Sequence, residues 1–455
     1  MLVHSATLSL LPREPDATPA SGTPAVVRGR VLQAVPWKAL AFVALALLPH
    51  SAVSQSSFLF VWAGGKGASE FMATIDADPA SATYGRVLAS VPTGTEGMPH
   101  HTEHELPLSG HLLANDFHAG RTWLFDLHEP LRPRILGSFG DVAGYSHPHT
   151  FIRLANGRVL STFQYRAVPV AGVSADVPME PHRSAPHGGM SGMAAMPPHL
   201  TGGLVEMDER GRPFLSASAV DTNIADRFIY PYSVLPIPAV DRAVSTTTDM
   251  NEADTVATSE WVQFWRLSDL KLLTSIALPP GPRGDENRFS GEARLLPDGR
   301  SVYIHTFNCG LYLVRHVDSS RPTATFVHGF AGKDCGVPIL TGHYWLQTVP
   351  AAHGLIALDI TDPEHPREIS RVSVGADEQP HWIALDPTGR RIVMNSGGHG
   401  NRLFIINFDP ANGRLSLDQR FHDPGSTSAG ILLTGANWPR GFIGNVMPHG
   451  AVFSR

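Results

Sequence analysis

The sequence predicts an all-β fold, a seven-bladed β-propeller whose ring is closed by the C-terminal strand. From Phe58 onward, short runs of alternating apolar and polar residues are separated by Gly, Pro, Asp and Asn, as in half-buried strands joined by tight turns. No convincing amphipathic helix extends beyond three turns. A four-strand pattern also recurs at a spacing of roughly 45–80 residues, which is typical of propeller blades.

Residues 380–418 show this repeat most clearly. Two strands meet at the turn Pro387-Thr388-Gly389, and two more are expected at 402–408 and 414–418. Comparable units begin at or near five other positions: His101, His149, Tyr230, Glu292 and Cys335. The segment from Phe58 to Val91 supplies a seventh unit that lacks its innermost strand. We expect Met447–Phe453 to pair beside Phe58 as that strand and so to leave no open sheet edge.

The N-terminal 54 residues have a different composition. Residues 1–30 are polar and rich in Pro, Ala and Ser, and we expect them to be disordered. The apolar run 39–48 follows basic residues and precedes Ala52-Val53-Ser54, which predicts a secretory signal. Because the run is short for a membrane span, membrane association is expected only if the signal stays uncleaved. We therefore predict one propeller domain, residues 55–455, in the periplasm or outside the cell.

The composition excludes several kinds of partner and site. A formal net charge of -6 and a pI near 6.4 give no general attraction to nucleic acid. No glycine-rich phosphate loop, Gly-x-Ser-x-Gly elbow or His-Glu-x-x-His helix is found. The two cysteines exclude a disulfide framework. We interpret Cys309 as a buried free thiol, with a Cys309–Cys335 bridge or a thiolate ligand at Cys335 as alternatives.

Histidines recur at equivalent places in separate repeat units. His101 precedes Asn115 by fourteen residues, and His381 precedes Asn395 by the same number. Pro-His steps mark comparable positions in two further units. In a propeller, residues just before the inner strands converge at one mouth of the central channel. The histidines expected to converge there are His101, His149, His381 and His449.

Converging imidazoles form a credible site for copper, zinc, iron or nickel. The alternative is that Pro-His only begins a strand and that the imidazoles bond backbone carbonyls in a polar channel. Because successive strand residues point oppositely, one of His100 and His104 is expected to orient a ligand from behind. Glu103 and His104 are our candidate acceptors of a substrate proton. Glu292, like Glu103, could take that proton or accept a hydrogen bond from a ligating histidine, with surface ion pairing as the alternative for both carboxylates. Other residues expected near the mouth are His147, Tyr232, His305, Cys335 and His343.

An insertion rich in methionine and histidine interrupts the third unit at residues 177–200. Thioethers suit Cu(I) and imidazoles suit Cu(II), so the insertion is a candidate copper-binding loop in an exported protein. A solvated insert without a role is the alternative. The residues concerned are Met179, His182, His187, Met190, Met193, Met196 and His199.

Several motifs resemble those of the selenium-binding proteins, a family that includes methanethiol oxidases. Together they cover about residues 58–410 in order; they are Glu70–Pro79 with Tyr84, His100-His101, Ser146–Thr150, Gly202–Asp208 and Val262–Ser268. The resemblance implies a β-propeller that binds copper through histidines and oxidises methanethiol with O2 to formaldehyde, hydrogen sulfide and hydrogen peroxide. It implies metal ligation by His101, His147 and His149, whereas His381 and His449 are candidates from the internal repeat alone.

Two departures from that family limit what the resemblance implies. Gly85 stands where the family commonly has a cysteine, and the family's cysteine-rich N-terminal stretch is missing. Selenium attachment at that position is therefore not implied. We predict a divergent, exported member that oxidises a small thiol with copper and O2. The alternative is a propeller without enzymatic activity that binds or delivers copper or selenium, or that docks a partner.

Overall fold

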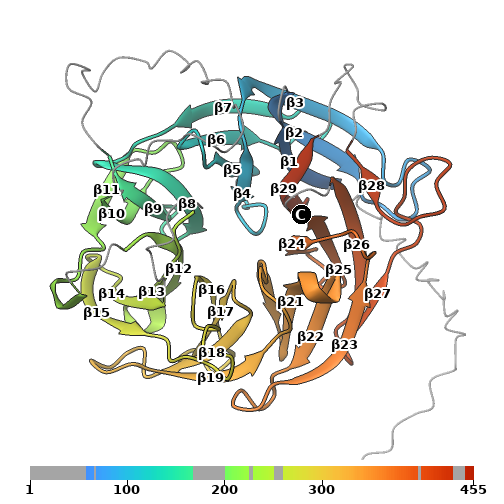
Figure 1. Ribbon diagram of the computed structural model, residues 1–455. Helices are drawn as coiled ribbons and strands as arrows, with labels where there is room; N and C mark the ends of the chain where they lie inside the picture. Colours follow the sequence, from blue (N-terminus) through green and yellow to red (C-terminus); the bar gives the residue numbers. More distant parts are fainter. Residues whose placement is uncertain are drawn as a thin grey trace, which may run out of the picture. The chain divides into compact units, whose positions relative to one another are not determined.

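Seven antiparallel sheets arranged in a ring make up the fold (Figure 1). The structure, a computed structural model, describes residues 58–65, 68–167, 200–224, 229–250, 260–397, 401–433 and 446–455. The predicted signal at 39–48 and, apart from Leu200, the insertion at 177–200 lie outside the described residues. The seven sheets confirm the seven-bladed all-β fold predicted from the sequence.

We number the sheets as blades 1 to 7 and give their strands from the ring centre outward. Blade 1 contains β29 (Met447–Phe453), β1 (Phe58–Gly65), β2 (Ala68–Asp76) and β3 (Val87–Glu96). Blade 2 contains β4 (Pro99–Thr102), β5 (His111–Asp116), β6 (Arg121–Asp126) and β7 (Arg134–Phe139). Blade 3 contains β8 (Tyr145–Arg153), β9 (Val159–Arg166), β10 (Thr201–Met207) and β11 (Pro213–Ser218).

The remaining blades follow in chain order. Blade 4 contains β12 (Pro231–Ile237), β13 (Arg242–Thr247), β14 (Trp261–Arg266) and β15 (Lys271–Ala277). Blade 5 contains β16 (Ser290–Leu295), β17 (Val302–Thr306), β18 (Gly310–Arg315) and β19 (Thr323–Gly329). Blade 6 contains β20 (Pro338–Thr341), β21 (Tyr344–Val349), β22 (Gly354–Asp359) and β23 (Arg367–Ser373). Blade 7 contains β24 (Pro380–Leu385), β25 (Arg391–Ser396), β26 (Arg402–Asp409) and β27 (Arg414–Leu417), and the short β28 (Ile431–Leu432) pairs with β26.

Helical structure in the described part of the chain is limited to three single turns, η1 (Thr222–Ile224), η2 (Pro238–Val240) and η3 (Pro350–Ala352). None of the described helices has the length and apolar character needed to cross a membrane.

The C-terminal strand closes the ring as predicted. β29 pairs antiparallel with β1, with Phe453 opposite Leu59 and Pro448 opposite Ala63. Blade 1 therefore combines one strand from the C-terminal segment with three from residues 58–96. This pairing satisfies the backbone groups that an open β1 edge would leave exposed.

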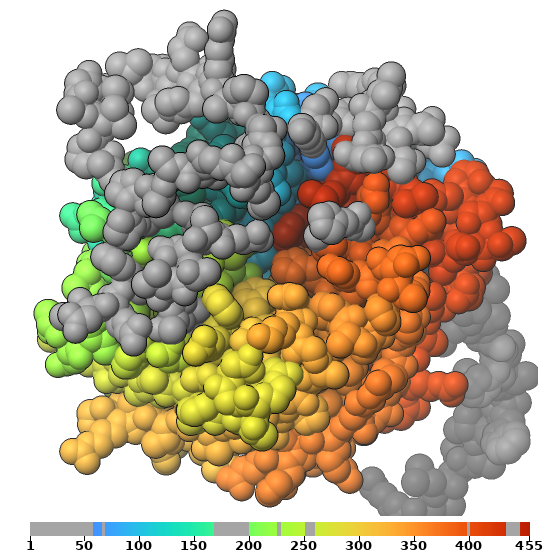
Figure 2. All heavy atoms as spheres, viewed as in Figure 1, coloured from blue at the N-terminus to red at the C-terminus, as the bar shows by residue number. Residues whose placement is uncertain are grey.

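Apolar side chains on facing sheets form the core between neighbouring blades. Leu346 and Leu355 of blade 6, for example, pack with Ile392 and Met394 of blade 7 in one buried cluster. Outer strands such as β23 alternate between exposed and half-buried residues, because only one of their faces meets a neighbour. With their side chains in place, the blades form a continuous body coloured in sequence order around the ring (Figure 2).

Most inner strands carry a β-bulge at the Pro-His step or its equivalent. The pairing register shifts between Pro99 and Thr102 in β4, between Pro148 and Phe151 in β8, and between Pro380 and Ile383 in β24. Proline has no N–H for the ladder and is tolerated at such bulges, which also re-aim neighbouring side chains. The Pro-His pattern therefore marks places where the strand turns its imidazole toward the ring centre.

The two cysteines form a disulfide, so the interpretation of Cys309 as a free thiol is wrong. Cys309 precedes β18 of blade 5, and Cys335 precedes β20 of blade 6; their Cα atoms lie 5.1 Å apart. Both sulfur atoms belong to a cluster of buried apolar side chains between these blades. With both thiols in this bond, Cys335 has no thiolate to offer a metal.

Candidate metal centre

Five histidines from four inner strands converge near the centre of the ring. We call them the histidine cluster: His100 and His101 on β4, His149 on β8, His381 on β24 and His449 on β29. One ligand atom each of His100, His101 and His149 lie within 4.8 Å of one another, and the same holds for His101, His381 and His449. His101 belongs to both groups. In Figure 1 these four strands lie at the inner edge of the ring.

Each histidine of this cluster has one buried ring nitrogen that lacks a hydrogen-bond partner in the described part of the protein. The unpartnered atoms are His100 Nδ1, His101 Nε2, His149 Nε2, His381 Nε2 and His449 Nε2. A buried polar atom without a partner costs about 1–3 kcal/mol, and five such atoms together need an explanation. A metal ion bound by imidazole would satisfy several of them at once.

The electrostatics of the cluster favour neutral imidazoles, the form that binds metals. Burial lowers the pKa of His149 and of His381 to about 4. Burial, together with the neighbouring imidazoles, also lowers the pKa values of His100, His101 and His449 well below the ordinary range. At neutral pH the cluster thus offers uncharged donors, which fit copper, zinc, iron or nickel.

A side chain on the second strand holds each bulge and reaches the next blade. Asn115 accepts the backbone N–H of His101 at 2.7 Å and donates to the carbonyl of Pro148 at 2.8 Å. Asn395 accepts the N–H of Trp382 at 2.7 Å and donates to the carbonyl of Pro448 at 2.8 Å and to that of His449. The bonded N–H lies fourteen residues before Asn115 but thirteen before Asn395, so the structure matches His101 with Trp382 and His100 with His381, one residue away from the frame expected from the sequence. We call these two asparagines the bridging residues.

In other blades a different side chain at the equivalent position accepts the backbone N–H of the inner strand. Thr162 accepts the N–H of Thr150 at 3.1 Å and donates to the carbonyl of Tyr232 at 2.8 Å. In blade 5 the ring of His305 takes this place, because its Nδ1 accepts the N–H of Glu292 at 2.9 Å. That bond leaves the hydrogen of neutral His305 on Nε2, so this histidine lies near the channel but is not prepared to bind a metal through Nε2.

His149 is held in the orientation that a ligand requires. Its Nδ1 lies 2.8 Å from the carbonyl oxygen of Tyr232, which only accepts, so Nδ1 carries the hydrogen and Nε2 the lone pair. The Tyr232 ring centroid is 4.0 Å from that of His149. The Tyr232 hydroxyl is buried and has no partner among the described residues, and burial raises its pKa well above the ordinary value.

Aromatic rings form the walls of the cluster. Trp382 lies 5.0 Å from His101, Phe117 lies 5.8 Å from His149, and Phe307 lies 6.4 Å from His381, all measured between ring centroids. Tyr232 also contacts Phe307 at 5.3 Å. These apolar surfaces limit the access of water and suit a small apolar group next to the imidazoles.

The two predicted proton acceptors lie in different surroundings. Glu103 receives a hydrogen bond from Arg153 Nε at 2.7 Å and one from the Leu113 N–H at 2.9 Å. Burial raises the pKa of Glu103, although Arg153 opposes that shift. His104 stacks on Trp382 at 4.9 Å, with an interplanar angle of 5°, and its Nε2 lies 3.7 Å from Glu292 Oε2. Trp382 thus contacts both His104 and the cluster histidine His101.

Glu292, predicted near the mouth as a proton or hydrogen-bond acceptor with ion pairing as the alternative, is a buried and ion-paired group. Its Oε2 accepts a hydrogen bond from Arg294 at 2.8 Å, whereas its Oε1 is buried and has no described partner. Burial opposes ionisation of Glu292, but Arg294 and His104 outweigh it and hold its pKa well below the ordinary range. An ion pair therefore lies beside His104, whose Nε2 is 3.7 Å from Glu292 Oε2 and 3.5 Å from Arg294 Nη2.

Two of the other predicted residues, His147 and His343, lie outside the histidine cluster. His147 has a positive φ of 57° and packs against Phe117 and Tyr165 at 5.4 and 5.0 Å. It is in neither of the two cluster groups found among the described residues. His343 lies exposed in the turn between β20 and β21 and stacks on Tyr344. His100, which we expected only as a neighbour, does belong to the cluster, because the bulge turns both imidazoles of the pair inward.

Comparison with known proteins gives a short sequence match and a broad structural one. No family model matches the chain. A 113-residue segment, 23% of this chain, is 34% identical to a methanethiol oxidase from Hyphomicrobium sp. The match covers 26% of that protein, so the chain spans about a quarter of its length. The likeness in sequence is therefore to a part of that enzyme.

Solved structures with the same fold cover most of the chain. A hypothetical selenium-binding protein from Sulfolobus tokodaii has a TM-score of 0.62 at 15% identity, covering 88% of this chain and 94% of that one. The periplasmic gluconolactonase PpgL of Pseudomonas aeruginosa has a TM-score of 0.57 at 16% identity, covering 88% and 99%. Proteins with such different names share the propeller, so these structures identify the fold alone.

Proposed function

We propose that this protein is a copper-dependent oxidase of small thiols, similar in activity to methanethiol oxidase. In the proposed reaction, methanethiol, O2 and water give formaldehyde, hydrogen sulfide and hydrogen peroxide. The thiol carbon loses two electrons, and O2 gains two to become peroxide. The observation that carries the proposal is the convergence of five buried, unpartnered imidazole nitrogens. The 34% identical segment of methanethiol oxidase supports the reaction class.

Copper fits both the ligands and the reaction. His101, His149, His381 and His449, with His100 beside them, would hold the ion through neutral imidazole nitrogens. Zinc accepts the same ligands but has no redox chemistry, whereas the reaction requires electrons to move from a thiol to O2. Bound copper would supply that one-electron exchange.

The protein's own residues would bind the thiol and receive its proton. Trp382, Phe307 and Tyr232 provide apolar contact for a methyl group and limit water. His104 is the proposed proton acceptor, because the ionised Glu292 beside it would stabilise the imidazolium that forms. Glu103, the second candidate, would have to release Arg153 before it could take a proton.

We also propose that the protein works in the periplasm or outside the cell. The secretory pattern at residues 39–54 supports this location. The disulfide between Cys309 and Cys335 supports it too, because such bonds persist mainly in oxidising compartments. The same disulfide, together with Gly85, disfavours selenium attachment to a cysteine, since the sequence has two cysteines and both are in the bond.

The test combines metal analysis with an assay of peroxide release. Full-length protein loaded with copper is expected to release hydrogen peroxide and hydrogen sulfide when methanethiol and O2 are supplied. His149→Ala should lose bound copper and activity together, whereas His343→Ala, a change in an exposed histidine, should keep both. His147→Ala is expected to keep its copper, because His147 lies outside both cluster groups.

Each outcome decides between the proposed function and its alternative. Copper bound in the wild type and lost in His149→Ala, but without peroxide from any small thiol, would identify a copper carrier. Equal copper content in wild type and His149→Ala would refute the histidine cluster as the copper site.

A further inference from the structure

A second group of metal-binding side chains lies in blade 2, remote from the histidine cluster. It consists of His111 at the start of β5, Asp126 at the end of β6, and His128 two residues later. One ligand atom from each lies within 4.8 Å of the others. His111 and Asp126 are directly paired across the two strands. This strand pairing fixes the spacing between His111 and Asp126.

The group lies at the opposite end of blade 2 from the histidine cluster. Asn115, which holds the bulge beside His101, is four residues from His111 on the same strand. At about 3.3 Å per residue, these two positions are roughly 13 Å apart. No imidazole of the histidine cluster takes part in the second group, so an ion bound there would be separate from the proposed copper.

Carboxylates orient both histidines of the group. The Nδ1 of His111 lies 2.9 Å from Glu209 Oε1, and the Nδ1 of His128 lies 2.8 Å from Asp126 Oδ1. An ionised carboxylate only accepts hydrogen bonds, so neutral His111 carries its hydrogen on Nδ1 and keeps the lone pair on Nε2. Glu209 behind this imidazole is the usual arrangement around a histidine ligand of a metal. An ion held by His128 Nδ1 and Asp126 Oδ1 would take the place of the hydrogen that joins these two atoms.

Neighbouring charges fix these carboxylates in place. Glu209, in the turn between β10 and β11, uses its second oxygen to accept a hydrogen bond from Arg153 at 2.9 Å. Asp126 Oδ2 accepts one from Arg134 at 2.7 Å. Arg134 is 62% exposed, so it can turn into solvent and release that oxygen to an incoming ion. Glu209 is therefore an orienting group, and Asp126 is the oxygen ligand.

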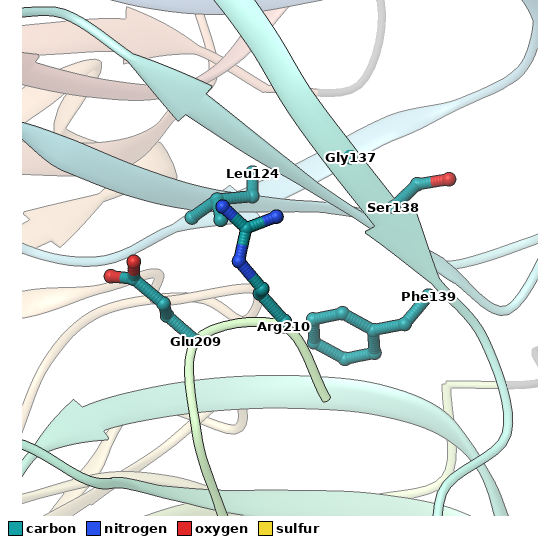
Figure 3. Close-up of a pocket in the computed structure, with 6 residues that line it drawn as sticks. All are labelled: Leu124, Gly137, Ser138, Phe139, Glu209 and Arg210. Atoms are coloured by element: carbon teal, nitrogen blue, oxygen red, sulfur yellow. The ribbon is translucent and has the colours of Figure 1, made fainter. Parts of the chain in front are cut away.

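Solvent reaches this part of the molecule. The side chains of His111 and His128 are 25% and 56% exposed. Glu209 also lines a small cavity of about 90 Å³ between blades 2 and 3, with Leu124, Gly137, Ser138, Phe139 and Arg210 (Figure 3). A cavity of this size has room for a few water molecules. Ion entry therefore requires no opening of the core.

We propose that His111, His128 and Asp126 bind a second divalent transition-metal ion, of the borderline class that includes Zn²⁺. Two imidazoles and one carboxylate are three protein ligands of the types Zn²⁺ accepts, and water would complete a four-coordinate site. The ligand atoms must approach by an ångström or more to reach bonds of about 2 Å, which the exposed side chain of His128, beyond the end of β6, permits. This site is independent of the proposed thiol oxidation.

The test counts Zn²⁺ ions bound by full-length, metal-stripped protein in equilibrium dialysis at micromolar free Zn²⁺. Zn²⁺ is the probe because the thioethers of the 177–200 insertion prefer Cu(I). Wild type is expected to bind one ion more per chain than His128→Ala and one more than His111→Gln. His365→Ala is the matched control, because exposed His365 pairs with Asp362 at 2.9 Å in the same way but has no second histidine nearby in the described groups.

The outcomes separate this site from the histidine cluster. His128→Ala combined with His149→Ala should lose one ion for each site, and the His128 difference should persist even if no thiol is oxidised. An equal Zn²⁺ count in wild type, His128→Ala and His111→Gln would overturn the proposal. An equal loss in His365→Ala would also overturn it, because surface histidines in general would then account for the binding.

Discussion

Replacing Asn395 by alanine tests whether the bridging residues position the metal ligands. Asn395 is buried and joins two blades, since it accepts the Trp382 N–H and donates to the carbonyls of Pro448 and His449. Alanine would leave the Trp382 N–H and the Pro448 carbonyl without these partners. At about 1–3 kcal/mol for each buried group, we expect the free energy of unfolding to fall by about 2–6 kcal/mol.

The same substitution should weaken metal binding. His449 would lose the bond that fixes its backbone, and loss of supporting contacts of this kind typically reduces metal affinity about 10- to 100-fold. Asn395→Asp keeps the acceptor for Trp382 but places a carboxyl oxygen against the carbonyls of Pro448 and His449, so it should weaken copper binding as well. Urea unfolding of the copper-free protein and copper competition with a chromophoric chelator measure the two quantities separately.

Asn156→Ala is the control for these measurements. Asn156 lies exposed in the β8–β9 turn, where its Oδ1 accepts the N–H of Arg158 at 2.9 Å. We expect its stability to change by no more than about 0.5 kcal/mol and its copper affinity to stay at the wild-type value. An Asn395→Ala protein that binds copper as tightly as wild type would refute the positioning role, whatever its stability.

Three further results are expected. The metal-free protein should lose stability as the pH falls from about 6.5 to about 4. Burial lowers the pKa of His149 to about 4 in the folded state, so the unfolded chain binds more protons than the folded one in that pH range. Urea midpoints that do not change with pH in this range would contradict the prediction. Cys335→Ala should lower the free energy of unfolding by roughly 3–4 kcal/mol, because the disulfide closes a loop of 26 residues, and the number of copper ions bound should stay unchanged. Loss of copper with unchanged stability would instead identify Cys335 as a ligand. His104→Ala should slow peroxide release with copper content unchanged. Glu103→Gln should mainly destabilise the fold, by about 1–3 kcal/mol, since it weakens a buried pair with Arg153 while Arg153 keeps Glu209 as a partner. The reverse pattern in kcat and urea unfolding would assign the proton to Glu103.

The repeat pattern predicted the fold because each blade is encoded by similar short-range features of the sequence. Pro-His steps, turns such as Pro387-Thr388-Gly389 and alternating strands are all short-range features of the sequence. The position of Gly389 in the left-handed region, at φ 69°, is an example of a turn requirement visible in the residue itself. Ring closure by β29 followed from the count of strands, since one blade lacked its innermost strand.

The side-chain geometry was less predictable, because it depends on backbone irregularities. Strict strand alternation would have pointed His100 and His101 to opposite sides, but the bulge between Pro99 and Thr102 brings both into the cluster. His147 matches a family motif, yet its positive φ directs it toward Phe117 and Tyr165. The pairing of the cysteines likewise depended on how closely blades 5 and 6 pack, which spacing alone does not reveal.

The strand that completes the ring also has a consequence for when the centre can assemble. His101 and His449 are separated by 348 positions (449 − 101), and β29 meets β4 closely: a Cβ at Gly450 would lie 2.6 Å from the Thr102 nitrogen. During translation, His449 is synthesised after the other four histidines. The complete set of donors therefore exists only once residue 449 has been added, so a shorter polypeptide cannot capture an ion in the final geometry.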